Sequence, residues 1–490
     1  MTAHDTAGNV GTAARPRRAA STGGRFLAVR TALTAWLGRP LASFHLVLAV
    51  FALLTALGLV MVLSASSVIS LKTGAGLYTV FKKQLLYVLI GAVLFWLGLR
   101  VPLERIRALS PAALAGSILL LMAVLTPLGS TLNGTQSWFR LGPFSFQPVE
   151  VCKLALALWG AHVLVLKRAV LHRYRHLLVP VVPVALLMFA LVMLQPDLGG
   201  TITLGVVLVA LLWFAGAPLR LFGALALGGL AGVALLAVGT DYRLARVLSF
   251  LSPEEDLAGS SYQALQAKLA LADGGLFGRG LGQGPSKSGY LPNVHNDFIF
   301  ALIGDELGFL GCVLVLGLFA MLAVVGMRIA TRNIDPWIRM VAATLTVWLV
   351  AQAAINIGYV VGMLPVTGIT LPLISSGGTS VVVTMLVFGI LANCARNEPE
   401  AVSALRSQGP GRFGKIMKLT APQPYKPPKK RKPARPTTPP RGTAQRRSTP
   451  QAEPRKRAPE RQGYPRAGGA ALARQKTSRG TPRNSKGGRR

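Results

Sequence analysis

Ten apolar stretches, all but the eighth about 18–25 residues long, alternate with polar connections, and this length matches the hydrocarbon core of a bilayer. They lie near residues 44–66, 80–99, 111–129, 148–167, 177–195, 199–217, 219–238, 297–327, 338–361 and 375–396. The eighth stretch is unusually long, so we expect its first residues to lie outside the bilayer. The pattern predicts an all-α integral membrane protein with ten transmembrane helices.

Lysine and arginine lie in every second connection and orient the predicted spans. Basic residues precede the first span, and they follow the second, fourth, sixth, eighth and tenth. By the positive-inside rule these connections and both termini are cytoplasmic, and 239–296 is a large extracytoplasmic loop between spans seven and eight. The predicted parts are a basic N-terminal segment (1–40), a membrane domain (41–396) and a cytoplasmic tail (397–490).

Composition separates the tail from the rest of the chain. Hydrophobic residues make up 51% of the sequence and charged residues only 14%, which excludes an ordinary soluble protein. Residues 401–490 carry 25 Lys and Arg against 2 Asp and Glu, with almost no large aliphatic side chains after Leu419. This composition predicts a disordered tail that binds an acidic cytoplasmic partner or anionic lipid. We expect no nucleic acid partner.

Only 17 carboxylates occur in the chain, and five of them lie at the edge of a predicted span or within it. An ionisable group at such a depth is costly, so it marks a functional site unless local structure explains it. The five residues are Glu150, Asp197, Asp297, Asp305 and Glu306. Three cysteines, Cys152, Cys312 and Cys394, lie singly within apolar stretches and indicate neither a disulfide framework nor a zinc site.

Local structure offers an alternative explanation for most of these acids. Glu150 follows Pro148 and precedes Lys153 by about one turn, which fits a helix start with an intrahelical ion pair. Asp197 lies in a turn and fits a helix cap, and Asp297 fits a capping acid and a functional acid equally well. Asp305 and Glu306 lie too deep for capping, so one of them is expected to pair with a cation or polar group.

Two small-residue segments could approach a phosphate group. Residues 278–284 have glycine at every second position, with Arg279 within and Lys287 after them, and their N–H groups could bind an anion. A loop that is simply flexible explains the same pattern. Ser376, Gly377 and Gly378 open the last span and suit a phosphate at a helix N-terminus, although a break needed only for packing fits as well.

Five segments match, in order, motifs of the SEDS family of cell-wall proteins (shape, elongation, division and sporulation). They are NGTQSWFRLGPFSFQPVEVCK (133–153), QPDLGG (195–200), YQALQAKLALADGGLFGRGLGQG (262–284), LPNVHNDFIFALIGDELG (291–308) and GMLPVTGITLPLISSGGTS (362–380). The chain resembles this family over about 44–396, and the HNDFIF form and the basic extension resemble its FtsW branch of actinobacterial type. Some members carry a lysine where this chain has Val366-Thr367.

The resemblance implies a peptidoglycan glycosyltransferase that polymerises lipid II into nascent glycan on the outer face of a bacterial cytoplasmic membrane. It implies septal synthesis in cell division, a class B penicillin-binding transpeptidase and division machinery proteins as partners, and Asp297 as the essential aspartate. A pyrophosphate leaving group needs no general acid, so one general base, Asp297, suffices. Cationic groups or a divalent metal, Mg²⁺ or Mn²⁺, would offset the charge that develops on the leaving group.

The substrate-binding residues that we expect beside Asp297 lie in the matched motifs, except Lys287, which follows one of them by three residues. They are Glu150, Lys153, Asp197, Arg140, Arg279, Lys287, His295, Ser376, Gly377 and Gly378. Three alternatives stay open at this stage: an elongation-type polymerase of the RodA branch, a transporter of lipid-linked precursors, and a scaffold that only recruits partners. A transporter should have a midplane site and paired repeats, whereas here the polar motifs gather on one side.

Overall fold

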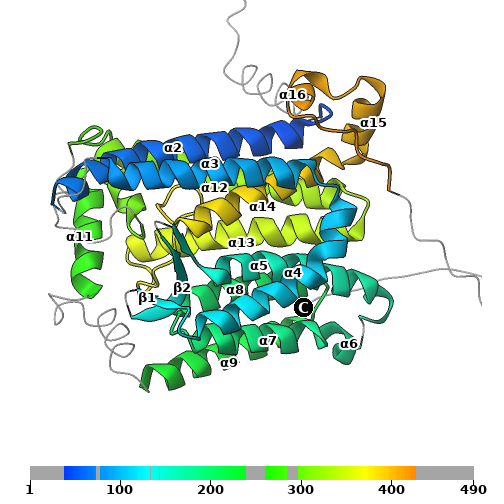
Figure 1. Cartoon of the computed structure of the whole chain (residues 1–490), viewed down its shortest axis with the longest axis horizontal. Helices are drawn as coiled ribbons and strands as arrows, with labels where there is room; N and C mark the ends of the chain where they lie inside the picture. Colours follow the sequence, from blue (N-terminus) through cyan, green and yellow to red (C-terminus); the bar gives the residue numbers. More distant parts are fainter. Residues whose placement is uncertain are drawn as a thin grey trace, which may run out of the picture. The chain divides into compact units, whose positions relative to one another are not determined.

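The computed structural model describes residues 38–72, 78–132, 134–142, 144–171, 173–238, 260–283 and 296–425, so Lys287 and His295 lie outside the described residues. Figure 1 shows a bundle of long, roughly parallel helices with a small sheet at one end. The bundle helices are α2 (Ala42–Lys72), α3 (Thr79–Arg100), α4 (Leu103–Val124), α5 (Pro148–Leu166), α7 (Val181–Met193), α8 (Leu198–Phe214), α9 (Leu219–Val238), α12 (Ile299–Arg332), α13 (Pro336–Val360) and α14 (Thr379–Arg396).

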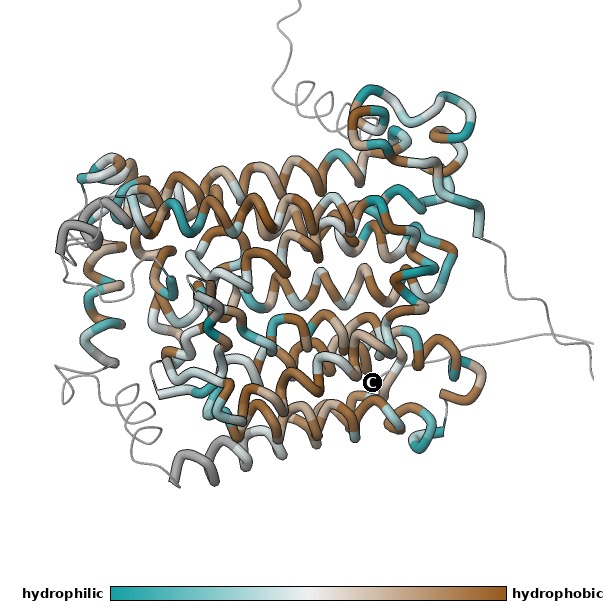
Figure 2. Tube along the Cα trace, in the orientation of Figure 1, coloured by the Kyte–Doolittle hydropathy of each residue, from teal (hydrophilic) through white to brown (hydrophobic). Residues whose placement is uncertain are grey.

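Each apolar stretch of the sequence overlaps one of these helices, although the third, predicted at 111–129, falls on a helix that spans Leu103–Val124. Among the described residues, seven helices are long and apolar enough to cross a membrane: α2, α3, α4, α5, α12, α13 and α14. The apolar segments in α7, α8 and α9 are shorter, at 10–17 residues. Hydrophobic residues dominate the bundle helices in Figure 2, and hydrophilic residues gather toward their ends. The fold is therefore that of an α-helical membrane protein.

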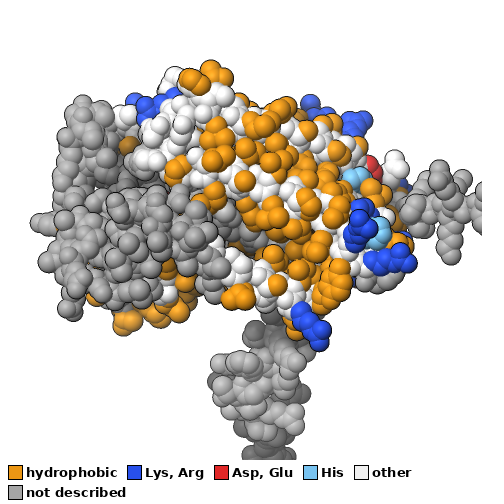
Figure 3. All heavy atoms as spheres, turned by 90° about the horizontal axis from the view of Figure 1, so that it is seen from below, with side chains coloured by type: hydrophobic (Ala, Val, Ile, Leu, Met, Phe, Trp, Pro, Cys, Tyr) orange, Lys and Arg blue, Asp and Glu red, His pale blue; other side chains and the backbone are white. Residues whose placement is uncertain are grey.

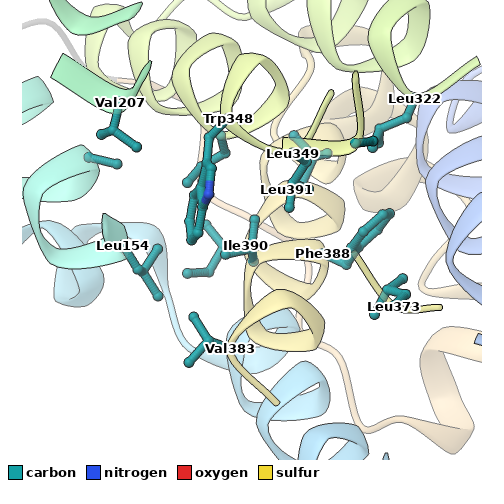
Figure 4. Packing of buried hydrophobic residues seen from close by; sticks show 14 of the residues in the cluster. Leu154, Val207, Leu322, Trp348, Leu349, Leu373, Val383, Phe388, Ile390 and Leu391 are labelled. Carbon is teal, nitrogen blue, oxygen red and sulfur yellow. The ribbon is translucent and has the colours of Figure 1, made fainter. Parts of the chain in front are cut away.

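The centre of the bundle is α14, which packs most extensively against α3. Figure 4 shows Phe388, Ile390 and Leu391 of α14 among Trp348 and Leu349 of α13. Glycine permits the close approach to α3, because a methyl group placed on Gly389 would collide with the backbone carbonyl of Phe95. The interior of the bundle is thus closely packed as well as apolar.

Two groups of shorter elements mark the two ends of the bundle (Figure 1). The end that we call the site end carries α11 (Ser260–Asp273), the segment 361–378 and a three-stranded antiparallel sheet. Its strands are β1 (Ser130–Leu132), β2 (Thr135–Leu141) and β3 (Phe144–Phe146), in the order β1-β2-β3. The other end, the tail end, carries α6 (Tyr174–Leu178), α15 (Pro399–Ser407) and α16 (Gly411–Ile416), and the 3₁₀ turn Arg168–Val170 precedes α6.

The helices α15 and α16 correct one expected boundary. A disordered tail was expected from residue 397, but residues up to Leu419 pack against the bundle, and Leu419 is buried. The Phe413 ring meets the Phe44 ring edge-on at 6.0 Å, and the Trp96 indole N–H donates to the Met417 carbonyl at 3.1 Å. A few apolar side chains before Leu419 are enough to fix this segment, and the expectation was wrong for residues 399–416.

The long α12 is interrupted at Gly308, whose φ of 68° and ψ of −166° only glycine adopts readily. The glycine-rich loop covers this kink: the Arg279 N–H donates to the Asp305 carbonyl, and the Gly280 N–H donates to the Glu306 carbonyl, both at 3.0 Å. These two N–H groups were expected to approach an anion. In the structure they satisfy carbonyls that the kink releases from the helix.

The tight contact of α14 with α3 predicts a specific sensitivity to added volume. Gly389→Ala forces a methyl group against the Phe95 backbone, which cannot move as a flexible side chain would, and should cost about 1–3 kcal/mol of stability. The melting temperature of the purified protein in detergent measures this loss. Gly317→Ala is the matched control because a methyl group there meets nothing within 4 Å. Equal melting temperatures for the two variants would contradict the close packing.

Candidate functional site

A buried ion pair stands at the start of α5. The Lys153 Nζ lies 2.8 Å from the Glu150 Oε2, and the two side chains are only 2% and 9% exposed. Lys153 also lies 3.4 Å from the Gln352 Oε1 of α13 and 5.2 Å from the centre of the Trp348 ring. The intrahelical pair expected from the spacing is confirmed. Lys153 also connects α5 to α13, and these additional partners help to stabilise a charge that is buried away from water.

Asp197 is the N-cap residue of α8. Its Oδ1 accepts a hydrogen bond of 2.7 Å from the Gly200 N–H, so the capping interpretation is correct. The second oxygen, Oδ2, accepts from the Gln147 side-chain amide at 3.0 Å, just before α5 begins. Burial raises the pKa of the Asp197 carboxyl above its ordinary value, against the opposing effect of the Gly200 N–H and of Lys153. Asp197 thus joins the starts of α5 and α8.

Asp297 precedes α12 by two residues, and Phe298 occupies the N-cap position, so Asp297 is not the capping residue of this helix. Its backbone is held from α13. The Asn356 side-chain amide donates to the Asp297 carbonyl at 2.9 Å, and the Tyr359 hydroxyl lies 2.8 Å from the same oxygen. The carboxylate lies beside Gly368, where an added methyl group would stand 3.7 Å from Oδ2. The side chain therefore faces the segment that follows α13.

That segment, residues 361–378, is called the bridging segment because it contacts the surroundings of both aspartates. Its Ile369 carbonyl accepts from the Asn356 amide at 2.7 Å and also lies 2.7 Å from the Tyr359 hydroxyl. On the side of Asp197, a methyl group on Gly199 would stand 2.8 Å from the Thr367 carbonyl oxygen. The bridging segment thus brings Asp297 and Asp197, which are 100 residues apart in the sequence, to one site.

The buried ion pair reaches the bridging segment through Gln352. Its side-chain amide donates to the Thr370 carbonyl at 3.0 Å, while its Oε1 accepts from the Trp348 indole N–H at 2.9 Å. The same Oε1 is the atom close to Lys153. The four sequence candidates Glu150, Lys153, Asp197 and Asp297 therefore surround one segment of non-helical backbone.

Ser376, Gly377 and Gly378 form the end of the bridging segment and lead into α14. Ser376 is half-buried, and Gly378 is the N-cap residue of α14, beside the ring of Tyr87. The first residue of α14, Thr379, donates its hydroxyl to the Ser145 carbonyl at 3.0 Å and accepts from the Gln147 N–H at 3.1 Å. The start of α14 is thus fixed to the sheet and to the start of α5.

The cationic candidates Arg279 and Arg140 have no direct contact with the bridging segment among those described above. Arg279 lies 3.3 Å from the Asp273 Oδ2 and 4.0 Å from the buried Asp305 Oδ1, so carboxylates compensate its charge. Arg140 is exposed on β2. The expectation that Asp305 or Glu306 pairs with a cation or polar group is confirmed, because Arg279 lies near Asp305 and the Ser64 hydroxyl lies 2.9 and 2.7 Å from the two carboxylate oxygens of Glu306.

Sequence reasoning missed the polar residues of α13 that hold the site together. Gln352, Asn356 and Tyr359 follow one another at intervals of four and three residues, so they share one face of the helix. Such a polar stripe within an apolar span is a signal that the sequence carries. The described residues contain no group of three or more His, Cys, Asp or Glu side chains that could hold a metal ion.

The fold and the polar site at one end of its bundle define an α-helical membrane protein. A family model described as "Cell cycle protein", which unites FtsW, RodA and SpoVE, matches residues 44–400. The chain therefore belongs to the FtsW, RodA and SpoVE family.

Two curated relatives align with most of this chain. The identity is 49% over 401 residues to the probable peptidoglycan glycosyltransferase FtsW of Mycobacterium tuberculosis, covering 82% of this chain and 76% of that protein. It is 39% over 346 residues to the stage V sporulation protein E of Bacillus subtilis, covering 70% and 94%.

Two solved structures share the fold. The rod shape determining protein RodA of Thermus thermophilus is 27% identical, with a TM-score of 0.54 over 74% of this chain and 99% of that one. A chain in a structure titled "Structural coordination of polymerization and crosslinking by a peptidoglycan synthase complex" is 28% identical, with a TM-score of 0.61 over the same shares.

The buried ion pair predicts that removing one charged partner destabilises the protein more than replacing both with neutral side chains. Lys153→Met leaves the Glu150 carboxylate buried without its cation, which should cost about 3–5 kcal/mol of stability. The double variant Glu150→Gln/Lys153→Met replaces the pair with neutral side chains of similar size and should recover much of that loss. Thermal unfolding of the purified variants in detergent measures both effects. A double variant less stable than Lys153→Met would contradict the pairing argument.

Proposed function

We propose that this protein is a peptidoglycan glycosyltransferase that polymerises lipid II into glycan strands, with Asp297 as its general base. The observation that carries the proposal is the position of Asp297, whose carboxylate faces the bridging segment beside the Glu150–Lys153 pair and Asp197. Membership of a family with relatives named peptidoglycan glycosyltransferase FtsW supports the same reaction.

The reaction follows from the chemistry of the leaving group. An oxygen of a sugar hydroxyl forms a bond to the anomeric carbon, and the bond from that carbon to the diphosphate oxygen breaks. The lipid diphosphate leaves with the bonding electron pair and needs no proton. The proton of the attacking hydroxyl passes to the Asp297 carboxylate, and such general base catalysis contributes roughly 10²–10⁴ in rate.

The surrounding residues position this base. Asn356 and Tyr359 fix the Asp297 backbone, and Phe298 is buried with its ring 5.8 Å from the Tyr359 ring at 76°. Lys153 is linked to the bridging segment through Gln352, and Asp197 caps α8 where Gly199 packs against the Thr367 carbonyl of that segment. Catalytic groups must be held in a productive geometry, and hydrogen bonds from a rigid helix provide that.

We further propose ten spans, with the site end outside the membrane and the tail end in the cytoplasm. Arg100, Arg332 and Arg396 lie in the last turns of helices that end at the tail end. Figure 3 shows one face of the molecule with abundant hydrophobic side chains and with most of its Lys and Arg gathered toward the end that carries α6. This charge distribution supports a cytoplasmic tail end.

The relatives support proposals for the cellular location and the partner of the enzyme. The division septum is the proposed location, a class B penicillin-binding transpeptidase the proposed partner, and the similar chain from a peptidoglycan synthase complex supports such a pairing. The basic residues after 400 suit an acidic cytoplasmic partner or anionic lipid. A transporter is the weaker alternative, because the polar residues gather at one end of the bundle instead of at its midplane.

The topology predicts which introduced cysteines an impermeant maleimide reaches in intact cells. A cysteine at Thr131, exposed at the site end, should react, whereas one at Ser407, exposed at the tail end, should react only after permeabilisation. The native cysteines Cys152, Cys312 and Cys394 are all buried and should give little background. The reverse pattern of labelling would overturn the proposed orientation.

The catalytic proposal predicts that Asp297→Asn loses polymerisation by at least about a hundredfold, the low end for a missing general base. The assay incubates the purified protein with its transpeptidase and lipid II and measures the polymer formed. Asp335→Asn is the matched control. Asp335 caps α13 at the tail end by accepting from the Trp337 N–H at 2.8 Å, and asparagine caps nearly as well. Normal polymer from Asp297→Asn would leave the mechanism without its base.

A further inference from the structure

The helix α11 (Ser260–Asp273) lies across the ends of the spans at the site end (Figure 1). One of its faces is packed: Ala267 and Ala270 are buried, and Leu271 fits against Gly304 of α12. Leu265 and Leu269, one turn apart, are 46% and 47% exposed. A helix that crosses the span ends and presents leucine outward is typical of a helix at the membrane surface.

Lys268 lies on α11 between these two leucines and reaches the bridging segment at Gly362. A methyl group placed on Gly362 would stand 2.5 Å from the Lys268 Nζ and would collide with its Cε. Gly362 also has a φ of +83°, which residues with a side chain rarely adopt. The absence of a side chain at Gly362 therefore makes room for the stem of Lys268.

The positive charge of Lys268 has no carboxylate to compensate it in the part of the chain that the structure describes. Two other cations near the site differ in this respect: Lys153 is paired with Glu150, and Arg279 is paired with Asp273 and Asp305. Lys268 is exposed, so its ammonium group is accessible to a ligand.

Lys268 and the catalytic Asp297 contact the same end of α13. The Tyr359 hydroxyl lies 2.8 Å from the Asp297 carbonyl, and the Tyr359 carbonyl accepts from the N–H of Gly362, the residue that Lys268 covers. The bridging segment then runs from Gly362 to Gly368, beside the Asp297 carboxylate. One short stretch of backbone thus connects the base with the uncompensated cation.

We propose that Lys268 binds the diphosphate of the polyprenyl-linked sugar substrate while Leu265 and Leu269 contact its lipid chain. This inference rests on the proposed function. A lipid diphosphate carries its negative charge at the membrane surface and its apolar chain within the bilayer, which matches a lysine flanked by exposed leucines on a surface helix. An ammonium group binds phosphate oxygens as a point charge, with hydrogen bonds strengthened by the charges.

Kinetics of the complex with the transpeptidase provide the first test. Lys268→Met keeps the length of the stem but removes the charge, and it should raise KM for lipid II about tenfold with a smaller change in kcat, as expected when substrate binding is lost. Lys268→Arg should restore most of the affinity. The matched control is Lys83→Met, since Lys83 is an exposed lysine on α3. An unchanged KM in Lys268→Met, or an equal rise in Lys83→Met, would overturn the proposal.

Direct binding separates this inference from the catalytic one. The Asp297→Asn protein, which is expected not to turn over, is titrated with undecaprenyl diphosphate, undecaprenol and inorganic pyrophosphate, with and without Lys268→Met. Lys268→Met should weaken only the binding of the diphosphate lipid, by about tenfold. Binding unaffected by Lys268→Met would refute the role of Lys268, and full displacement of the lipid by an equal concentration of pyrophosphate would refute a lipid-linked ligand.

The two proposals fail in different ways. If Asp297→Asn polymerises normally while Lys268→Met still loses affinity for the diphosphate lipid, the base is wrong and the role of Lys268 stands. If Asp297→Asn is inactive and Lys268→Met behaves as the wild type in both assays, the proposed function stands and the role of Lys268 is wrong. Equal melting temperatures for wild type and Lys268→Met exclude misfolding as the cause of any loss.

Discussion

Non-helical backbone that is buried in a bundle must find hydrogen-bond partners within the protein, because neither lipid nor bulk water reaches it, and residues 371–375 of the bridging segment are buried. In this protein α13 provides them. Gln352, Asn356 and Tyr359 lie on one face of that helix and bind the carbonyls of Thr370, Ile369 and Asp297. Since Tyr359 has one hydroxyl proton, it donates to only one of its two carbonyl neighbours at a time, and the Asn356 amide serves both. The shape of the site depends on this stripe.

The kink in α12 also leaves backbone groups that need hydrogen-bond partners, and here the glycine-rich loop provides them. Gly308 breaks the helix, and the carbonyls of Asp305 and Glu306 then accept from the N–H groups of Arg279 and Gly280. The Phe309 N–H donates to the Gly275 carbonyl at 2.9 Å, so the loop and the helix exchange bonds in both directions. The glycines of this loop allow backbone to approach backbone. The loop therefore anchors α12 just beyond the candidate base.

Charge is distributed according to depth. The buried Lys153 and Glu150 neutralise each other, and the buried Asp305 has Arg279 nearby, as the cost of isolated charges in a low-dielectric interior requires. Lys268, on the exposed surface of α11, carries a charge that no described carboxylate compensates. Under the proposal for Lys268, the neutralised pairs hold the shape of the site and this accessible cation meets the phosphates of the substrate.

The sequence by itself determined the features that depend on local spacing and composition. Apolar length placed the helices of the bundle approximately, the three-residue interval between Glu150 and Lys153 gave their ion pair, and the turn at Asp197 gave a helix cap. The matched motifs also identified the family correctly, and they drew attention to Asp297 before its surroundings were known. The ion pair and the cap were predictable because they involve neighbours within about one helical turn.

Only the tertiary structure decided which of these residues meet. Asp297 is bound by Asn356 and Tyr359, some 60 residues later, and the link from Asp297 to Asp197 runs through the bridging segment. Likewise, the glycine-rich loop resembled an anion site in sequence, yet two of its N–H groups serve a helix kink that a single glycine, Gly308, creates. Long-range partners depend on how helices pack, and hydrophobic spacing along one helix does not specify its neighbour.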